Sequence, residues 1–403
     1  MHKIEQLLQT LAPKGVEFRK LGEVINILKG KQLNKELLLD YGEYPVMNGG
    51  IHASGYWNEY NTDYPKIIIS QGGASAGYVN YMTSKFWAGA HCYAIELNSE
   101  KLNYKFLYYF LKNSQTILMK SQFGAGIPAL NKADIETLTI PIPPLEIQQE
   151  IVKILDAFTE LNTELNTELK ARKKQYEYYQ NMLLDFNDIN LNHKDAKMSA
   201  KTYPKRLKSL LQTLAPKGVE FRKLGEVCDF QKGKSITKKA VTFGKVPVIS
   251  GGRQPAYYHN EANRSGETIA ISSSGVYAGY VSYWDIPVFL ADSFSVSPKQ
   301  KTLMPKYLFH YLTTQQDAIH ATKSTGGIPH VYSKDLQNFL IPIPPLEIQQ
   351  EIVKILDQFS LLTTDLLAGI PAEIKARKKQ YEYYREKLLT FKPLTPNKEV
   401  KKC

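Results

Sequence analysis

Few stretches of the 403-residue sequence carry side chains at a spacing typical of enzyme chemistry. Gly233-Lys234-Ser235 matches the end of a phosphate-binding loop, G-x-x-x-x-G-K-[ST], but Cys228 stands where the first glycine belongs. His91 and Cys92 are adjacent, yet no second pair follows at the spacing of a zinc site. These segments therefore predict neither a nucleotide site nor a metal site.

Methyl transfer and acyl transfer are equally poorly supported. The nearest match to an Asn/Asp/Ser-Pro-Pro-aromatic motif, Ile142-Pro143-Pro144-Leu145, lacks both the polar residue and the aromatic one. The glycines of Phe123-Gly-Ala-Gly126 are spaced differently from those of an F-x-G-x-G cofactor loop. Serines, histidines and aspartates are scattered, without a nucleophile-elbow signature. The sequence predicts no catalytic site.

The frame of the chain is a duplication. Three segments recur unchanged at an offset of about two hundred residues: 7–24 and 210–227, 140–156 and 341–357, and 170–179 and 375–384. The middle segment reads IPIPPLEIQQEIVKILD in both copies. The inserts at 25–139 and 228–340 have diverged and share only short landmarks. These are Pro45–Gly50 with Pro247–Gly252, Ala-Gly-Tyr-Val at 76–79 and 278–281, and Gly-Ile-Pro at 126–128 and 327–329. This pattern predicts two modules that have the same kind of function but act on different targets.

Each insert has the texture of an α+β module. Lys66–Ser70 and Thr268–Ser272 are buried-strand patterns. Tyr104–Leu118 and Tyr307–Ile319 have the spacing of a helix. Residues 3–11 further predict a short amphipathic helix before the first module.

Two long helices are predicted after the modules. Apolar residues from Ile147 onward alternate steps of four and three, which is the seam of a coiled coil. The second copy runs from Ile348 to Leu389, with a helix-breaking dip at Gly369–Pro371. We expect the two helices to pair antiparallel with a module at each end, the alternative being a helix laid on its own module. The TELN repeat at 159–169 is either low-complexity filler or a ruler between the modules.

The predicted domains follow from these patterns. They are a first module with its N-terminal helix at 1–141, a first spacer helix at 142–184, a linker at 185–206, a second module at 207–342, and a second spacer helix with a tail at 343–403.

Composition sets outer bounds on function. The net charge of +12 and the pI of about 9.2 favour a polyanionic partner. Residues 25–141, however, hold ten lysines against nine acidic residues and no arginine, so charge alone leaves nucleic-acid binding open. Three cysteines without a C-x-x-C pair indicate a reducing compartment. Without an apolar run of membrane-spanning length or a signal-peptide core, we expect a cytoplasmic protein with no membrane partner.

The repeated segments and the variable inserts together resemble a known family. Two variable modules, each followed by PIPPLEIQQEIVKILD at 141–156 and 342–357, resemble the specificity (S) subunits of type I restriction-modification systems. The segments Leu8–Val24 and Leu211–Val227 extend the resemblance over essentially the whole chain. It implies an α+β fold: two α/β target-recognition domains in pseudo-twofold repeat, separated and joined by two long antiparallel coiled-coil helices.

The resemblance also implies a function and partners. Each module would read one half of a bipartite double-stranded DNA target, and the helices would set the half-site spacing. Two methyltransferase (M) subunits and the restriction (R) subunits would supply catalysis, with S-adenosylmethionine, ATP and Mg bound there and no cofactor in this chain. The chain departs from the pattern at Gly369-Ile-Pro371, which replaces the repeat and puts strict twofold symmetry in doubt. A protein–protein scaffold and a self-contained DNA-modifying enzyme are the competing hypotheses.

Candidate DNA-binding residues follow from base-edge chemistry, in which Arg or Lys suits guanine and Asn or Gln suits adenine. They occupy equivalent loops in the two modules: the K-G-K segment, the stretch after each Gly-Gly, and the turn after each core strand. In the first module they are Lys29, Lys31, Asn48, His52, Tyr56, Gln71 and Tyr78. In the second module they are Lys232, Lys234, Ser250, Arg253, Tyr257, Ser272, Ser274 and Tyr277. We expect the four lysines to contact phosphates rather than bases.

Overall fold

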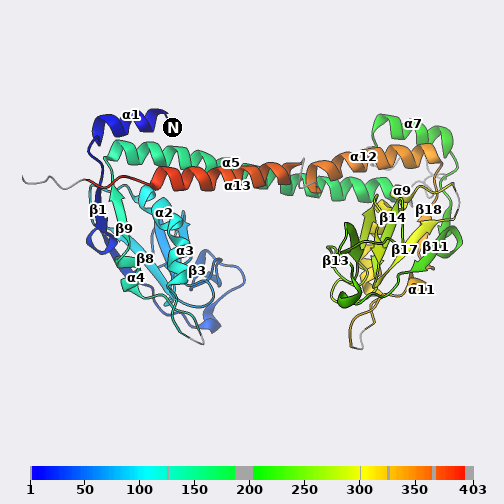
Figure 1. The fold of residues 1–403 in the computed structure, drawn as a ribbon, viewed down its shortest axis with the longest axis horizontal. Coiled ribbons are helices and arrows are strands. Elements are labelled where there is room, and N and C mark those ends of the chain that lie inside the picture. The colour runs from blue at the N-terminus through cyan, green and yellow to red at the C-terminus, as the bar shows by residue number, and fades with distance from the viewer. Residues whose placement is uncertain are drawn as a thin grey trace, which may run out of the picture. The chain divides into compact units, whose positions relative to one another are not determined.

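Two compact units make up the computed structural model (Figure 1). The first is formed by Met1–Asn166 with Ile374–Cys403, and the second by Thr167–Glu373. Each unit thus combines one module with parts of both long helices. The residues that the structure describes are 2–124, 127–186, 203–299, 301–324, 327–364 and 369–394.

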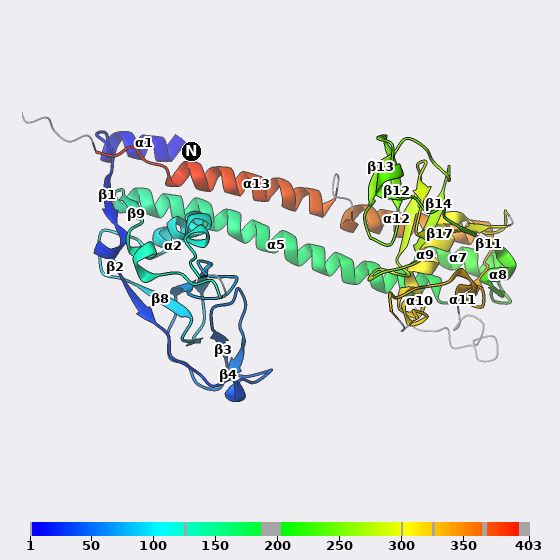
Figure 2. The same cartoon turned by 60° about the horizontal axis from the view of Figure 1, so that its bottom comes forward.

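The first unit is built on two sheets and a strand pair. The pair joins β1 (Glu17–Lys20) to β9 (Thr139–Ile142), antiparallel. The larger sheet is antiparallel, in the order β2 (Ile25–Lys29), β8 (Cys92–Leu97), β5 (Lys66–Ser70) and β6 (Val79–Met82). The smaller sheet has the order β4 (Gly55–Trp57), β3 (Tyr44–Met47) and β7 (Trp87–Ala88), with β3 and β7 parallel. It lies at the end of the module away from α5 (Leu145–Leu184), as Figure 2 shows.

One helix of the first unit packs on its larger sheet. That helix is α2 (Tyr104–Asn113); the unit also contains α1 (His2–Leu11), α3 (Gln115–Lys120), α4 (Lys132–Glu136) and the 3₁₀ turns η1 (Leu21–Glu23) and η2 (Lys35–Leu37). The prediction of a single helix over Tyr104–Leu118 is wrong in one respect. The helix is interrupted at Ser114, which is the C-cap of α2 and the N-cap of α3. The break lets the Gln115 side chain accept a hydrogen bond from the Val79 amide at 3.1 Å.

The core of the first unit joins three parts of the chain that are distant in sequence. Ile67, Ile69 and Ile95 of the sheet are essentially inaccessible to solvent, and pack with the inward face of α2. The core continues onto α5 and the end of α13 (Ile370–Leu389). Each fully buried aliphatic side chain contributes about 1.5–3 kcal/mol to folding, so the helices are integral to the module's stability.

The second unit repeats this order of elements. Its strand pair is β10 (Phe221–Lys223) with β18 (Leu340–Pro342), and its larger sheet is β11 (Cys228–Lys232), β17 (Ser293–Pro298), β14 (Thr268–Ser272) and β15 (Val281–Trp284). Its smaller sheet is β13 (Tyr257–His259), β12 (Val246–Ile249) and β16 (Phe289–Leu290). Its helices are α7 (Lys205–Leu214), α8 (Leu224–Val227), η3 (Lys238–Ala240), α9 (Pro305–Thr314), α10 (Gln316–Ala321), α11 (Ser333–Leu336) and α12 (Leu346–Thr364).

The long helices pair through the same two aromatic residues of the repeat in both units. In the first unit Phe158 of α5 stacks on Tyr384 of α13, with ring centroids 5.6 Å apart. In the second, Phe359 of α12 stacks on Tyr179 of α5 at 5.1 Å. In the first unit α5 and α13 lie side by side and run in opposite chain directions, as Figures 1 and 2 show, which confirms the predicted antiparallel pairing.

The two long helices differ in continuity. The first is unbroken over 40 residues. The second is divided into α12 and α13, and the predicted dip at Gly369–Pro371 lies at the start of α13. A Cβ added to Gly369 would lie 2.4 Å from the Leu361 carbonyl oxygen, so only glycine fits at this turn. Among the described helices, none has the length and apolarity needed to cross a membrane.

Candidate nucleic-acid interface

Backbone hydrogen bonds join the K-G-K segment of each module to one short segment that precedes a strand of the larger sheet. We call residues 88–92 and 290–293 the connector segments. In the first module Gly30 donates its amide to Cys92 O at 2.9 Å, and Lys31 donates to Ala88 O at 2.8 Å. A Cβ on Gly30 would meet Gly89 O at 2.1 Å, so the close approach requires glycine.

The second module repeats this arrangement. Gly233 and Lys234 donate their amides to Ser293 O and Leu290 O, both at 2.8 Å. The backbone of each K-G-K segment is therefore fixed. The flanking lysine side chains remain exposed in both modules.

The stretch that leads into each Gly-Gly landmark is bonded to the same connector segment. Gly89 donates its amide to Met47 O at 2.9 Å, and His91 donates to Asn48 Oδ1 at 3.2 Å. In the second module Ala291 donates to Ile249 O at 2.8 Å. The Asn48 side chain thus already serves to position this loop.

The turn after each core strand completes the cluster. Gln71 donates its amide to His91 O at 2.8 Å, and Ser273 donates to Asp292 O at 3.0 Å. Three loops distant in sequence therefore converge on each connector segment, and most of the candidate DNA-binding residues lie on them.

Exposure separates the candidates into three groups. The exposed ones are Lys29, Lys31, His52, Tyr56, Lys232, Lys234, Arg253, Tyr257 and Tyr277. Half-buried are Asn48, Gln71, Tyr78, Ser250 and Ser274. Ser272 is buried, and its hydroxyl donates to Ser250 O at 3.1 Å, so it offers no surface to a ligand in this conformation. Tyr56 and Tyr257 lie on strands β4 and β13 rather than on loops.

Arg253 is held in place by aromatic rings. Its guanidinium carbon lies 5.0 Å from the ring centre of Tyr277 and 5.5 Å from that of Tyr280. Burial lowers the pKa of the neighbouring His320, and the charges of Lys323 and Arg253 lower it further. A guanidinium that lies over aromatic rings is pre-organised for a flat, polar partner such as a base edge.

Tyr78 is less accessible than its position in the loop suggests. The Lys112 ammonium lies 4.0 Å from the centre of its ring. Burial, together with the charge of Arg385, lowers the pKa of Lys112 to about 8. One face of the tyrosine is therefore occupied by a partly desolvated lysine.

Sequence reasoning did not identify the side chains of the connector segments as candidates. His91 and Asp292 are both exposed and occupy equivalent places, since the carbonyl of each accepts the amide that follows the core strand. Asp292 also accepts a hydrogen bond from the Ser274 hydroxyl. Their position just before the buried strands β8 and β17 was the available signal. Within the described ranges, no group of three or more His, Cys, Asp or Glu side chains could hold a metal ion.

Comparison with known families decides the class of protein. The family model for the type I restriction modification DNA specificity domain matches the chain twice, over residues 13–174 and 216–376. Those two ranges make up most of the sequence. The chain belongs to the type I restriction-modification specificity family.

Individual specificity subunits resemble the chain along its whole length. It is 30% identical to the specificity subunit of an Escherichia coli type I restriction enzyme, over 98% of both chains. A Haemophilus influenzae relative named for the same subunit is 33% identical, over 93% of this chain and 96% of its own. The crystal structure of the type I S subunit from M. genitalium has a TM-score of 0.65 at 25% identity, over 93% and 96% of the two chains. The predicted fold class, and a specificity rather than a catalytic subunit, are confirmed.

The repeated motif of the specificity subunit holds each module to its long helix. Gln148 is fully buried; its amide nitrogen donates to Lys101 O and Pro143 O, and its oxygen accepts from the Asn103 amide. Gln349 makes the same three bonds, to Thr302, Pro344 and Met304. This bonding gives a structural reason why both copies of EIQQE keep their first glutamine.

The aspartate that ends the repeated motif forms a second attachment, which differs between the units. Asp156 accepts hydrogen bonds from Lys105 at 2.7 Å and from Tyr109 at 2.5 Å. Asp357 accepts one from Lys306 at 2.6 Å and lies 3.0 Å from His310 Nε2. The specificity subunit thus uses a common lysine and a module-specific second partner.

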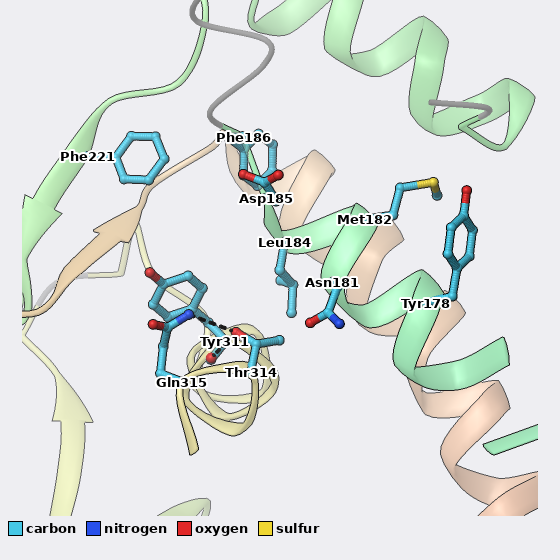
Figure 3. A pocket seen from close by; sticks show the side chains of 10 residues that line it. All are labelled: Tyr178, Asn181, Met182, Leu184, Asp185, Phe186, Phe221, Tyr311, Thr314 and Gln315. Atoms are coloured by element: carbon cyan, nitrogen blue, oxygen red, sulfur yellow. Dashed lines mark hydrogen bonds between the residues drawn. The ribbon is translucent and has the colours of Figure 1, made fainter. Parts of the chain in front are cut away.

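A hollow of about 490 Å³ lies in the second unit of the specificity subunit, where the end of α5 meets β10 and the end of α9 (Figure 3). Side chains from the end of α5, from β10 and from the end of α9 line it, and they are mainly apolar or aromatic: Tyr178, Asn181, Met182, Leu184, Asp185, Phe186, Phe221, Tyr311, Thr314 and Gln315. None of the candidate DNA-binding residues belongs to this lining, so the hollow is distinct from the three-loop cluster.

Proposed function

We propose that this specificity subunit binds double-stranded DNA, with each module reading one half of a split target. The observation that carries the proposal is the cluster of three loops on each connector segment. The backbone bonds of the cluster are the same in both modules, whereas the exposed side chains differ. Two modules that recognise different sequences need a constant backbone arrangement and variable side chains that contact the bases.

Particular positions support different half-sites. Arg253 follows the Gly-Gly landmark of the second module, where the first module has Ile51. On the connector segment Asp292 replaces His91. Arginine suits guanine and a carboxylate suits the cytosine amino group, so the second module would favour G·C pairs at these contacts.

The exposed lysines of the K-G-K segments would bind phosphates and set the register on the duplex. They occur in both modules, as expected for contacts that carry no sequence information. Affinity should consequently fall as salt rises, since each phosphate contact releases counterions.

The paired helices would fix the separation and rotation between the half-sites. Phe158 and Tyr179 are twenty-one residues apart on α5, whereas Phe359 and Tyr384, which stack on them, are twenty-five residues apart. One TELN unit of four residues corresponds to about 6 Å of helix. A change in the number of these units would alter the length of α5 without touching either module.

Catalysis would come from partner subunits. Two M subunits would dock on the helices and bring S-adenosylmethionine, and R subunits would bring ATP and Mg for restriction. In this scheme the chain acts in the cytoplasm, carries no cofactor and contributes only the recognition of the DNA sequence.

The test is a methylome with a module exchange. The chain is co-expressed with the M subunit of its host, and methylated adenines are mapped by single-molecule sequencing. We expect a motif with two short defined halves and an unspecified gap. Replacing residues 25–139 with the insert of another specificity subunit should change one half only, with the second half as internal control.

Other outcomes would favour the competing hypotheses. A stable complex that modifies no DNA would support a protein scaffold. Methyl transfer by the purified chain alone would support a self-contained enzyme. A continuous motif would contradict the assignment of one reading function to each module.

A further inference from the structure

The Gly-Ile-Pro landmark has a side chain that neither the fold nor base reading explains. Its proline has a structural use, because Pro128 O accepts the Gly73 amide at 2.8 Å and Pro329 O accepts the Gly275 amide at 3.0 Å. The isoleucine has no comparable burial. Ile127 is 80% exposed and Ile328 is 66% exposed, although free aliphatic surface of this size is unfavourable.

The segment that carries each isoleucine is bonded to the turn that follows the core strand. The Leu130 amide donates to Gln71 O at 2.8 Å, and the Val331 amide donates to Ser273 O at 2.9 Å. These bonds join the segment that carries the isoleucine to the three-loop cluster in both modules. The isoleucines therefore lie on a segment that is bonded to the loops carrying the candidate reading residues.

The surroundings of Ile328 combine apolar surface with positive charge. On the turn bonded to this segment, Val276 is 81% exposed and Tyr277 is 42% exposed. The Lys323 ammonium donates to Val276 O at 3.2 Å, and the Arg253 guanidinium lies over the Tyr277 ring. We call Ile328, Val276 and Tyr277 the apolar tip of this module. Such a tip suits the apolar base stack of a duplex, and the cations beside it suit the flanking phosphates.

The first module supports the same partner. Phe123 pairs with Ala129 across the segment that carries Ile127, and its ring is 50% exposed. Here the positive charge comes from Lys29 and Lys31, fixed on the same connector segment. Both modules thus combine exposed apolar side chains with exposed lysines on loops of one bonded cluster, although the inserts have diverged.

We propose that Ile127 and Ile328 are apolar wedges that press into the base stack, one in each half-site, independently of sequence. This inference rests on the proposed function, in which both modules bind DNA. A residue that reads sequence should differ between modules with different targets, as Arg253 and Ile51 do. A residue kept in both modules, with its side chain exposed, should do what both half-sites need alike.

The test uses the purified full-length chain and fluorescent duplexes with the split target, a target altered in one half, or an unrelated sequence. In the double variant Ile127→Ala/Ile328→Ala, affinity should fall by the same factor on all three duplexes. Loss of the buried methylene and methyl groups predicts roughly five- to thirtyfold per module. The slope of affinity against salt should not change, because no phosphate contact is lost.

Two control variants sharpen the comparison. Lys29→Ala/Lys232→Ala should reduce the salt slope by about one per lysine, the signature of a lost phosphate contact. Ile127→Leu/Ile328→Leu should retain affinity, because it keeps the apolar volume. A 2-aminopurine placed in each half-site should brighten on binding the wild-type chain and remain dim with the alanine variant, since brightening reports unstacking.

Several results would overturn the proposal. Unchanged affinity would mean that the isoleucines make no contact with DNA, and an effect on one sequence only would make them readers. Normal DNA binding with lost assembly of the M-subunit complex would identify the tips as a protein-docking surface. If the wild-type chain binds none of the duplexes, the proposed function itself fails, which is a separate outcome.

Discussion

The buried glutamine of the repeated motif permits a quantitative test of how each module is fastened to its helix. In Gln148→Met the side-chain volume is kept, but the bonds to Pro143 O, Lys101 O and the Asn103 amide are lost. The bond to Pro143 is buried and the other two are partly buried. An orphaned buried group costs about 1–3 kcal/mol and a partly hydrated one about 1, so we expect roughly 3 kcal/mol of destabilisation.

Tryptophan positions allow each unit to be followed separately. Trp57 and Trp87 lie in the first unit, and Trp284 lies in the second. Urea unfolding in a Trp284→Phe background reports on the first unit, where a loss of 3 kcal/mol at a slope of about 2 kcal/mol/M lowers the midpoint by about 1.5 M. Gln349→Met should shift the Trp284 transition by a similar amount.

The adjacent glutamine provides a matched control. Gln149 follows on the same helix but is exposed, so Gln149→Met should change stability by no more than about 0.5 kcal/mol. Equal effects of the two substitutions would refute the reasoning. So would a loss of less than about 1 kcal/mol for Gln148→Met, because the three bonds would then have little net value.

Three further predictions concern recognition, spacing and pH. Arg253→Ala should reduce methylation at sites defined by the second half-sequence and leave the first half unchanged; an unaltered methylome would exclude Arg253 as a reader. Deleting Thr163–Asn166 should shorten the gap in the motif while both halves persist, which the same methylome measures; an unchanged gap would exclude the ruler. Burial alone would raise the pKa of Asp357, but hydrogen bonds from His310 and Lys306 outweigh it and hold the pKa below its usual value. That carboxylate stabilises the second unit above about pH 4 and loses its effect as pH falls through the lowered pKa, so acid unfolding of Asp357→Asn should depend less on pH than that of wild type.

The parts of the fold that depend on local pattern were predictable. KIIIS and TIAIS are short apolar runs, and they form the central strands β5 and β14. The four-three spacing after Ile147 predicted α5, and exact repetition predicted that two such helices would pair. In these cases neighbouring residues alone determine which surface must be buried.

Features that depend on distant contacts were not predictable. The convergence of three loops on each connector segment arises from backbone bonds between residues about 20 to 60 positions apart, and side-chain periodicity does not reveal such bonds. For the same reason Ser272 was expected to contact DNA, whereas the fold buries its hydroxyl against Ser250. The role of Gln148 was hidden as well, since repetition marked the motif without showing which of its two glutamines turns inward.

The division of the chain into units also bears on the order in which they can form during synthesis. The second unit is continuous in sequence, from Thr167 to Glu373, so all of its parts leave the ribosome together. The first unit begins at the N-terminus, but its core includes Leu388 and Leu389 from the last helix. The module that is made first therefore keeps part of its apolar core uncovered until α13 has been synthesised. A nascent chain that stalls before Ile374 would present a finished second unit and an unfinished first one.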